Sequence, residues 1–217
     1  IAVEVANDGA VNILCKSSGR KIVDCFSFVD TADIGSSYNF KSANDKPIMS
    51  KSFKPSIRMI ENNKYKSVCS ISYDMELPEC FDFENKTRSQ TMITEHCELV
   101  LTLTTMSKYL EVEYKIDNKA KDHRLRLVVN TDVIADNFIA DIPFDIITHE
   151  DDDIHPFTQD NVHPNTSFAA IESNENALAV LTEGAHGCAK LEKNKLAFTL
   201  VRSTGAIDGN AGKQWHT

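Results

Sequence analysis

Polar and apolar residues alternate along several stretches of this chain, and this pattern limits the fold more than any other sequence feature. Apolar side chains stand at every second position in the ranges 99–103, 110–116 and 125–129. A period of two residues is typical of strands that bury one face, because successive side chains point to opposite sides of a sheet. No apolar stripe with helical spacing persists for three turns. The pattern therefore predicts an all-β protein.

Turn-forming residues separate the predicted strands. Asn7-Asp8-Gly9 stands between two apolar runs, and Asp117-Asn118-Lys119 and Lys193-Asn194 follow further along the chain. Asn, Asp and Gly tolerate positive φ and therefore favour hairpin turns. About a dozen short strands with turns between most of them are typical of a sandwich or barrel. No internal repeat or composition break divides the chain, so we expect residues 1–217 to form one domain, a large antiparallel β-sandwich with sheets packed face to face.

Three segments depart from the alternating pattern. The acidic stretch from Met75 to Glu84 is compatible with one helical turn, and Pro78 argues against a longer helix. The ranges 35–54 and 136–164 are rich in proline and polar residues, which predicts two long loops. Long loops on a rigid β scaffold commonly carry function.

Charge and cysteine content exclude several classes of protein. The formal net charge of −9 repels phosphate backbones, so we expect no nucleic-acid partner. No run of about 20 apolar residues and no secretory leader is present, so we expect no membrane span and no secretion. The six cysteines form no C-x-x-C pair, and most lie in apolar or alternating stretches. We expect reduced, buried thiols in a cytoplasmic protein, with disulfides as the alternative.

Two patterns in the range 136–164 suggest metal binding, and each has a simpler interpretation. The acidic run 150–153 offers oxygen ligands, but it lacks the ligand spacing and the turn glycine of a calcium loop, so we expect a solvated loop. His155 and His163 each precede a proline, but no cysteine or third histidine stands at ligand spacing. We therefore expect no metal site in this chain.

Acid–base chemistry is the next possibility, because His96 and His123 lie on predicted strands. A sugar epimerase of the mutarotase type needs a histidine and a glutamate that face each other in a cleft. Glu95, Glu98 and Glu113 are available, but their spacing singles out no pair, so structural histidines are the simpler interpretation. No Gly-x-Ser-x-Gly motif or phosphate-binding glycine loop is present. Spacing cannot assign the carboxylate pair of a glycosidase, because the pair need only converge in space.

Six motifs in a fixed order resemble one known family. They are Ala2–Val5 with Asp8-Gly9, Val11–Ile13 and Lys16–Arg20; Phe28–Asp30 with Asp33–Phe40; Leu125–Leu127 with Asn130-Thr131; Ala140–Asp145; Ala177–Gly184; and Leu196–Ser203. Together they resemble the β-domain that follows the catalytic part of family 38 glycoside hydrolases, the α-mannosidases. The similarity covers nearly the whole chain and is greatest to the bacterial cytosolic branch, which includes mannosylglycerate hydrolases.

Two positions depart from the pattern of that family. Cys15 replaces an aspartate beside Lys16, which leaves the expected fold unaffected. Ser36 replaces the aspartate of a "G-D-x-Y" motif, which argues against a sugar-binding carboxylate at this position.

The resemblance implies a role within a longer enzyme. Members of the family are retaining hydrolases that use one carboxylate as nucleophile and another as acid/base, with a zinc-type divalent metal that binds sugar hydroxyls. In the family these groups come largely from a preceding α/β barrel and helical domain. The resemblance therefore implies a C-terminal fragment without catalytic or metal-binding residues, inactive alone, which packs on its own N-terminal catalytic domain and lines one side of an α-mannoside pocket. It also implies a supersandwich of the galactose mutarotase kind, and it leaves a homo-oligomer open.

Two residues are implied as sugar contacts by the same resemblance. Tyr38 is the first, because its phenol can hydrogen-bond a sugar hydroxyl; a structural tyrosine at the edge of the cleft is the alternative. Arg202 is the second, with an ion pair at the end of a strand as the alternative. A separate carbohydrate-binding module would need exposed aromatic side chains to stack on sugars, and the single tryptophan, Trp215, lies in a polar tail.

Overall fold

The computed structural model describes residues 1–150 and 161–204, together with the backbone of residues 206–207 and 210–211. The chain is all-β and its strands pair antiparallel, which confirms the predicted class. The one helical element of the described part is a 3-10 turn, η1 (Ser50–Ser52). In that same part, no helix has the length and apolar character needed to cross a membrane.

Two sheets supply most of the structure. A four-stranded sheet has the order β11-β10-β7-β6, with β6 (Ser56–Asn62), β7 (Lys66–Pro78), β10 (Met92–Thr104) and β11 (Glu111–Asp117). A six-stranded sheet has the order β15-β18-β19-β12-β4-β5, with β4 (Phe26–Ala32), β5 (Ile48–Met49), β12 (His123–Asn130), β15 (His163–Pro164), β18 (Gly187–Glu192) and β19 (Lys195–Ser203).

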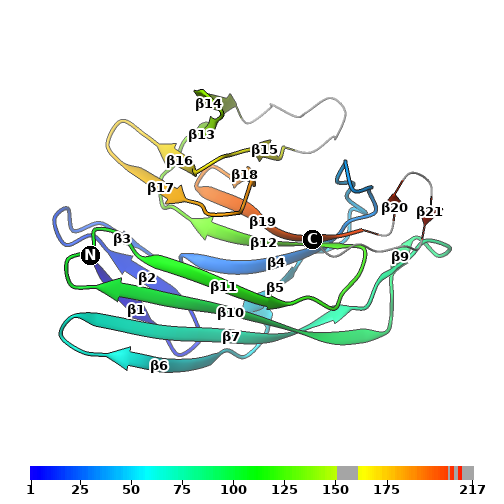
Figure 1. Ribbon diagram of the computed structural model, residues 1–217, viewed down its shortest axis with the longest axis horizontal. Helices are drawn as coiled ribbons and strands as arrows, with labels where there is room; N and C mark the ends of the chain where they lie inside the picture. Colours follow the sequence, from blue (N-terminus) through cyan, green and yellow to red (C-terminus); the bar gives the residue numbers. More distant parts are fainter. Residues whose placement is uncertain (151–160, 205, 208–209, 212–217) are drawn as a thin grey trace.

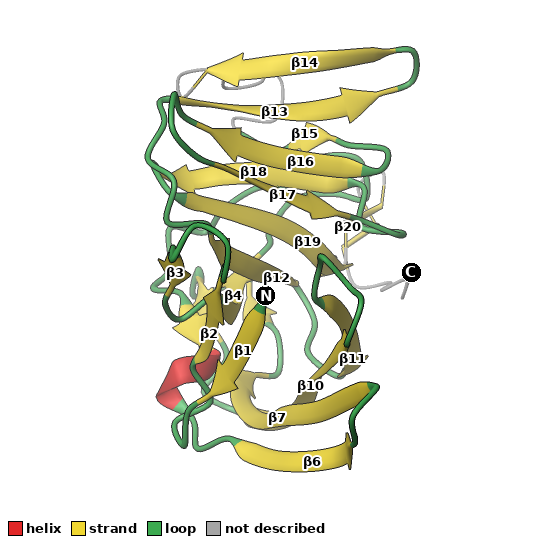
Figure 2. Cartoon of the chain, turned by 90° about the vertical axis from the view of Figure 1, so that its left-hand side faces the viewer, coloured by secondary structure: helices red, strands yellow, loops and turns green. Residues whose placement is uncertain are grey.

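Smaller sheets complete the fold. A second four-stranded sheet has the order β14-β13-β16-β17, with β13 (Asn137–Ile142), β14 (Asp145–Glu150), β16 (Phe168–Glu172) and β17 (Ala177–Leu181). A three-stranded sheet joins β1 (Ala2–Val5), β2 (Val11–Leu14) and β3 (Lys21–Ile22). Two short pairs are β8 (Phe81–Asp82) with β9 (Thr87–Arg88) and β20 (Ala206–Ile207) with β21 (Asn210–Ala211). Figures 1 and 2 place β13, β14, β16 and β17 at one end of the molecule, β6 and β7 at the other, and the six-stranded sheet between them.

One hydrophobic core connects the sheets. It contains Phe28 of β4, Leu125 of β12, Ile71 of β7, Leu99 of β10 and Ile171 of β16. Leu99 and Leu101 of β10 and Leu125, Leu127 and Val129 of β12 belong to this core, so both alternating stretches form strands as predicted. The expectation that β12 buries only one face is wrong, because Arg124, Arg126 and Val128 on its other face are buried as well. Side chains from different sheets share one core because each sheet has an apolar face that water would otherwise contact.

The predicted helical turn at Met75–Glu84 is wrong. Strand β7 continues to Pro78, and β8 begins at Phe81. Met75 and Leu77 are fully buried and lie opposite Glu95 and Ile93 of β10. Burial of these apolar side chains against a long partner strand decides the local structure, and a proline at the end of a strand interrupts no interior pairing.

The two predicted loops have different outcomes. The range 35–54 contains only β5 and η1 and is otherwise irregular, as expected. The range 136–164 is not one loop, because β13 and β14 form a hairpin within it and β15 follows. Pro143 lies in the turn of this hairpin, where it breaks no ladder of hydrogen bonds.

The cysteine prediction is largely confirmed. All six are free thiols, so no disulfide forms. Cys25, Cys69, Cys97 and Cys188 are buried, whereas Cys15 and Cys80 are half-buried.

Candidate functional site

The loop between β4 and β5 carries Tyr38, and a buried carboxylate fixes its shape. Asp33 directly follows β4 and is 1% exposed. Its Oδ1 accepts hydrogen bonds from the backbone N–H of Gly35 at 3.0 Å and of Lys41 at 3.2 Å. The N–H of Ile34 donates to the carbonyl oxygen of Lys41 at 2.9 Å. The outgoing and returning backbone of the loop therefore meet at Asp33.

A tight turn at the tip of this loop presents Tyr38 to solvent. Ser36 Oγ accepts from the N–H of Tyr38 at 3.2 Å and of Asn39 at 3.3 Å. A Cβ atom on Gly35 would lie 2.0 Å from the carbonyl oxygen of Asn39, so a larger residue cannot take its place without moving the turn. The side chain of Tyr38 is 75% exposed. Ser36, which replaces the aspartate of the family pattern, thus caps the turn.

Arg202 of β19 lies against the same loop. Its Nε donates to Asp33 Oδ2 at 2.7 Å, and its Nη2 donates to the carbonyl oxygen of Ser36 at 3.0 Å. The side chain of Arg202 is 24% exposed, so part of it remains in contact with solvent. The ion pair considered as the alternative for Arg202 is present. The structure thus brings the two predicted residues, Tyr38 and Arg202, to one loop through Asp33.

A second cation supports the loop from the neighbouring strand. Arg124 of β12 pairs in register with Arg202, and its guanidinium carbon lies 3.3 Å from the centre of the Phe40 ring. Such cation–π contacts strengthen when water is excluded, and Arg124 is 4% exposed. The six-stranded sheet therefore holds this loop by two adjacent arginines.

A chain of contacts between buried and partly buried polar side chains anchors the far end of the loop, and no sequence pattern predicted it. Asp45 accepts from the N–H of Ala32 at 3.1 Å and pairs with Arg88 Nη1 at 3.4 Å. Arg88 Nη1 also lies 2.5 Å from Asp30 Oδ1. Asp30 Oδ2 lies 2.6 Å from His123 Nδ1. The interacting side chains come from β4, β9, β12 and the loop, far apart in sequence, so no local spacing could signal them.

The two histidines considered for acid–base chemistry, His96 and His123, are hydrogen-bonded to side chains other than glutamate. His96 lies 2.7 Å from Asp74 and is half-exposed, whereas His123 is fully buried beside Asp30. Glu95 Oε2 accepts from the backbone N–H of Lys119 and Ala120. The hydroxyl of Ser70 donates to Glu98, and together with Lys115 it holds the pKa of Glu98 below its usual value. The geometry that a mutarotase-like epimerase requires is therefore not formed by these groups.

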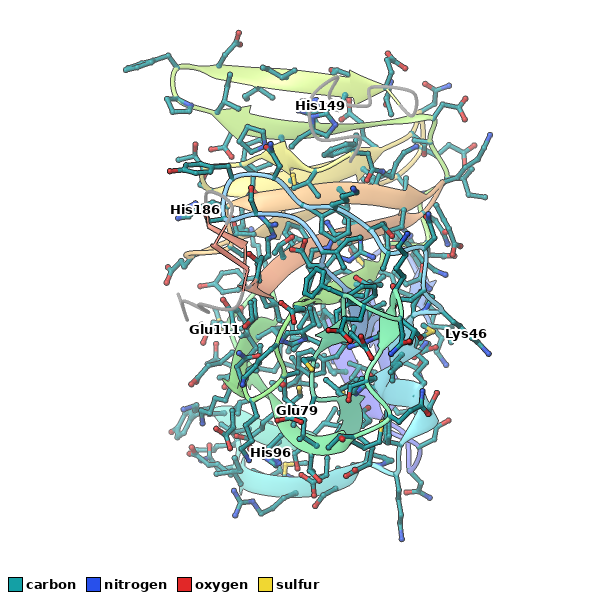
Figure 3. The ribbon with its side chains drawn as sticks, turned by 90° about the vertical axis from the view of Figure 1, so that its right-hand side faces the viewer. Lys46, Glu79, His96, Glu111, His149 and His186 are labelled. Atoms are coloured by element: carbon teal, nitrogen blue, oxygen red, sulfur yellow. The ribbon has the colours of Figure 1, made fainter. Side chains whose placement is uncertain are left out.

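Metal ligands do not converge in the part of the chain that the structure describes, where no three His, Cys, Asp or Glu side chains form a possible metal site. His163 is buried on β15, with its ring centre 3.9 Å from that of His149. His155, residues 151–153 of the acidic run, and Trp215 lie outside the described residues. Figure 3 shows that His149 and His96 lie near opposite ends of the molecule and share no site.

The fold is that of a β-domain found in solved glycoside hydrolases. It is similar to an α-mannosidase from Enterococcus faecalis V583, with a TM-score of 0.88 and 24% identity, over 97% of this chain and 26% of that one. A protein in glycosyl hydrolase family 38 from Enterococcus faecalis has a TM-score of 0.86 and 24% identity, over 99% of this chain and 26% of the other. At this level of identity, the likeness establishes the fold.

Sequence comparison gives the family. The family model described as "Glycosyl hydrolases family 38 C-terminal domain" matches residues 1–210, so the chain belongs to that family. A protein of Halalkalibacterium halodurans named "Putative mannosylglycerate hydrolase" is 28% identical over 94% of this chain and 25% of its own length. The chain thus spans about a quarter of the length of the relatives it matches. The predicted resemblance is confirmed, and the binding-module and epimerase alternatives are not favoured.

Proposed function

We propose that this chain is the C-terminal domain of a longer retaining α-mannosidase and that it lines one side of the sugar pocket. The single observation that carries the pocket assignment is the loop at Asp33, which joins Arg202 to the turn that presents Tyr38. An exposed tyrosine on a rigidly held turn suits recognition, because little conformational entropy is lost when the sugar binds. The phenol can donate to a hydroxyl of an α-mannoside, and the guanidinium can donate to another oxygen.

The remaining parts of the enzyme are assigned to other segments of the full-length protein. Since the chain spans about a quarter of the length of its relatives, we assign a zinc-type divalent metal and the carboxylate nucleophile to a preceding catalytic domain. A metal there would bind sugar hydroxyls. We further propose that the sheets here form a supersandwich, that residues 1–217 act as one domain, and that the enzyme is a bacterial cytoplasmic protein. The free thiols are compatible with that compartment. Mannosylglycerate is one candidate substrate, suggested by the name of the relative.

Hydrolysis of p-nitrophenyl α-mannoside by the full-length enzyme tests this proposal. We expect Tyr38→Phe to lower kcat/KM about tenfold, because one hydrogen bond to the sugar is lost. Tyr65→Phe is the matched control, since Tyr65 is also exposed but lies between β6 and β7, and we expect it to leave kcat/KM unchanged. A full-length enzyme that hydrolyses no α-mannoside would refute the proposal, as would hydrolysis by residues 1–217 alone.

A further inference from the structure

We infer that Asp33 is a positioning residue for the proposed sugar site: one buried carboxylate sets both the Arg202 guanidinium and the turn that carries Tyr38. The inference rests on the proposed function and names a third residue on which the site depends. Asp33 is 1% exposed and therefore acts through the two residues that it holds.

The two carboxylate oxygens of Asp33 accept hydrogen bonds from different parts of the structure. Oδ1 accepts from the N–H of Gly35 and of Lys41, and so holds the base of the loop. Oδ2 accepts from Arg202 Nε. Because both oxygens belong to one rigid carboxylate, the distance from the loop to the guanidinium cannot change without loss of one of these contacts. The ion pair is partly shielded from water, and its charge-assisted hydrogen bond is stronger than a neutral one.

Arg202 closes the connection back to the tyrosine. Its Nη2 donates to the carbonyl oxygen of Ser36, whose side chain accepts from the N–H of Tyr38. The contacts thus run from Asp33 through Arg202 and Ser36 to Tyr38. A displaced guanidinium would withdraw a donor from Ser36 and so loosen the turn that aims Tyr38. The turn also packs so closely on Gly35 that a Cβ atom there would meet the backbone of Asn39 and Lys41.

The substitution Asp33→Asn separates these two sets of hydrogen bonds in the full-length enzyme. The amide oxygen can still accept from Gly35 and Lys41, but the amide NH₂ then faces the Arg202 Nε–H, and two donors cannot bond. Asp136→Asn is the matched control, because Asp136 also meets a cation at 2.7 Å, from Lys193, but both side chains are exposed and remote from the loop. Gly35→Ala distorts the same turn without a change of charge.

Two readouts decide the inference. We expect Asp33→Asn to speed amide hydrogen exchange in residues 34–41 and to lower kcat/KM about tenfold. We also expect Tyr38→Phe to have a much smaller effect in the Asp33→Asn enzyme than in the unchanged enzyme, because the tyrosine is already misplaced. Gly35→Ala is expected to reduce the effect of Tyr38→Phe in the same way, and Asp136→Asn to alter neither readout.

The contrary outcomes are distinct. Unchanged exchange in residues 34–41 would overturn the inference whether or not the enzyme acts on mannosides. Effects of Asp33→Asn and Tyr38→Phe that multiply independently would also overturn it, since they would show that Asp33 acts on stability alone. If the unchanged enzyme hydrolyses no α-mannoside, the proposed function fails, and the exchange experiment still decides whether Asp33 fixes the loop.

Discussion

His123 Nδ1 lies 2.6 Å from Asp30 Oδ2, and neither side chain is exposed to solvent. A second histidine–aspartate pair on strands, His96 with Asp74, has nearly the same separation of 2.7 Å, but its side chains are 48% and 72% exposed. The two pairs therefore differ in burial and in their further partners, since Asp30 also contacts Arg88 and His123 also contacts Asn118. This difference gives a direct measure of how much the interior charge network stabilises the fold.

Loss of the buried histidine should be costly. We expect His123→Ala to lower the free energy of unfolding by about 3–5 kcal/mol, because Asp30 is then left with fewer partners in the interior. His96→Ala is the control and should cost less than about 1 kcal/mol, because water replaces the lost contact. Urea denaturation of both variants measures the difference. Equal losses would show that burial of the pair does not strengthen it.

The hairpin turn between β13 and β14 is strained. Ile142 pairs with Asp145, which leaves Pro143 and Phe144 as the two turn residues, and Phe144 has φ = 74° with a fully exposed side chain. We expect Phe144→Gly to raise the free energy of unfolding by about 0.5–1 kcal/mol. Relief of a left-handed conformation is worth about 1–2 kcal/mol, and glycine entropy in the unfolded chain offsets part of it.

A matched variant separates backbone strain from side-chain exposure. Phe144→Ala keeps a Cβ atom at positive φ and removes only the exposed ring. Phe144→Ala should therefore not raise the free energy of unfolding, measured by thermal denaturation, as Phe144→Gly does. A gain as large as that of Phe144→Gly would show that the backbone conformation is not the cause.

Cys15 should be the most reactive thiol. Hydrogen bonds from Ser17 and then Ser18 lower its pKa to about 6, whereas burial raises the pKa of Cys25 and Cys188 to about 12. Since the thiolate is the nucleophile, we expect alkylation of Cys15 by iodoacetamide at neutral pH, with a rate that rises through a midpoint near pH 6. Mass spectrometry of the labelled peptides measures the rates.

The serine next to this thiol provides the control. Ser17→Ala removes the largest cause of the lowered pKa, so the midpoint of alkylation should move upward, toward the ordinary value of 9.0. An unchanged midpoint would exclude the hydrogen bond as the cause. Preferential labelling of Cys188 would contradict its burial.

Asp141 should make stability depend on pH in the acid range. Burial acts to raise the pKa of this carboxyl, but hydrogen bonds from Ser167, Phe168 and Thr166 outweigh it and hold the pKa well below the ordinary 3.8. A lowered pKa in the folded state means that the carboxylate stabilises the fold above pH 3.8 and that this contribution fades as the pH falls further. We expect the Asp141→Asn protein to unfold at a lower urea concentration than the unchanged protein at pH 7. The difference between their urea midpoints should shrink below pH 3.8.

The control for that titration lies on the same hairpin. Asp145 accepts one hydrogen bond from a described backbone group, the N–H of Ile146. Asp145→Asn should therefore cost much less stability at pH 7 than Asp141→Asn. A deficit of Asp141→Asn that stays constant from pH 7 into the acid range would rule out titration of this carboxyl as its source.

Local pattern alone was sufficient for the strands with clear alternation. Leu99 to Leu103 and Leu125 to Val129 lie on strands as predicted, because a period of two matches the pleat of any sheet. The prediction of a helical turn at Met75–Glu84 is wrong, because it rests on local acidic residues, whereas the partner strand β10 lies later in the chain. Pairing with a distant strand outweighed local preference, as is common for β structure.

The candidate site also contains residues that the sequence predicted and residues that only the structure shows. Tyr38 and Arg202 could be named in advance, because short motifs around them match a family. The sequence could not predict that Asp33 holds the loop and Arg202 together, because Arg202 lies 169 positions away and no spacing rule links the two residues. The sequence also did not predict the network of Asp30, Arg88 and His123, since a charged residue inside a strand ordinarily indicates a solvent-facing position.

Sequence patterns were enough to predict the all-β class and the family, since each depends on side chains close together in the chain or on motifs that keep their order. They favoured reduced thiols but left disulfides open until the structure showed six free cysteines. Only the tertiary structure decided which charges are buried and which residues hold the loop of Tyr38. The physical reason is that a buried charge is tolerated where partners from other strands surround it. Those partners, such as Asp33 and Arg202, meet only after the sheets have formed.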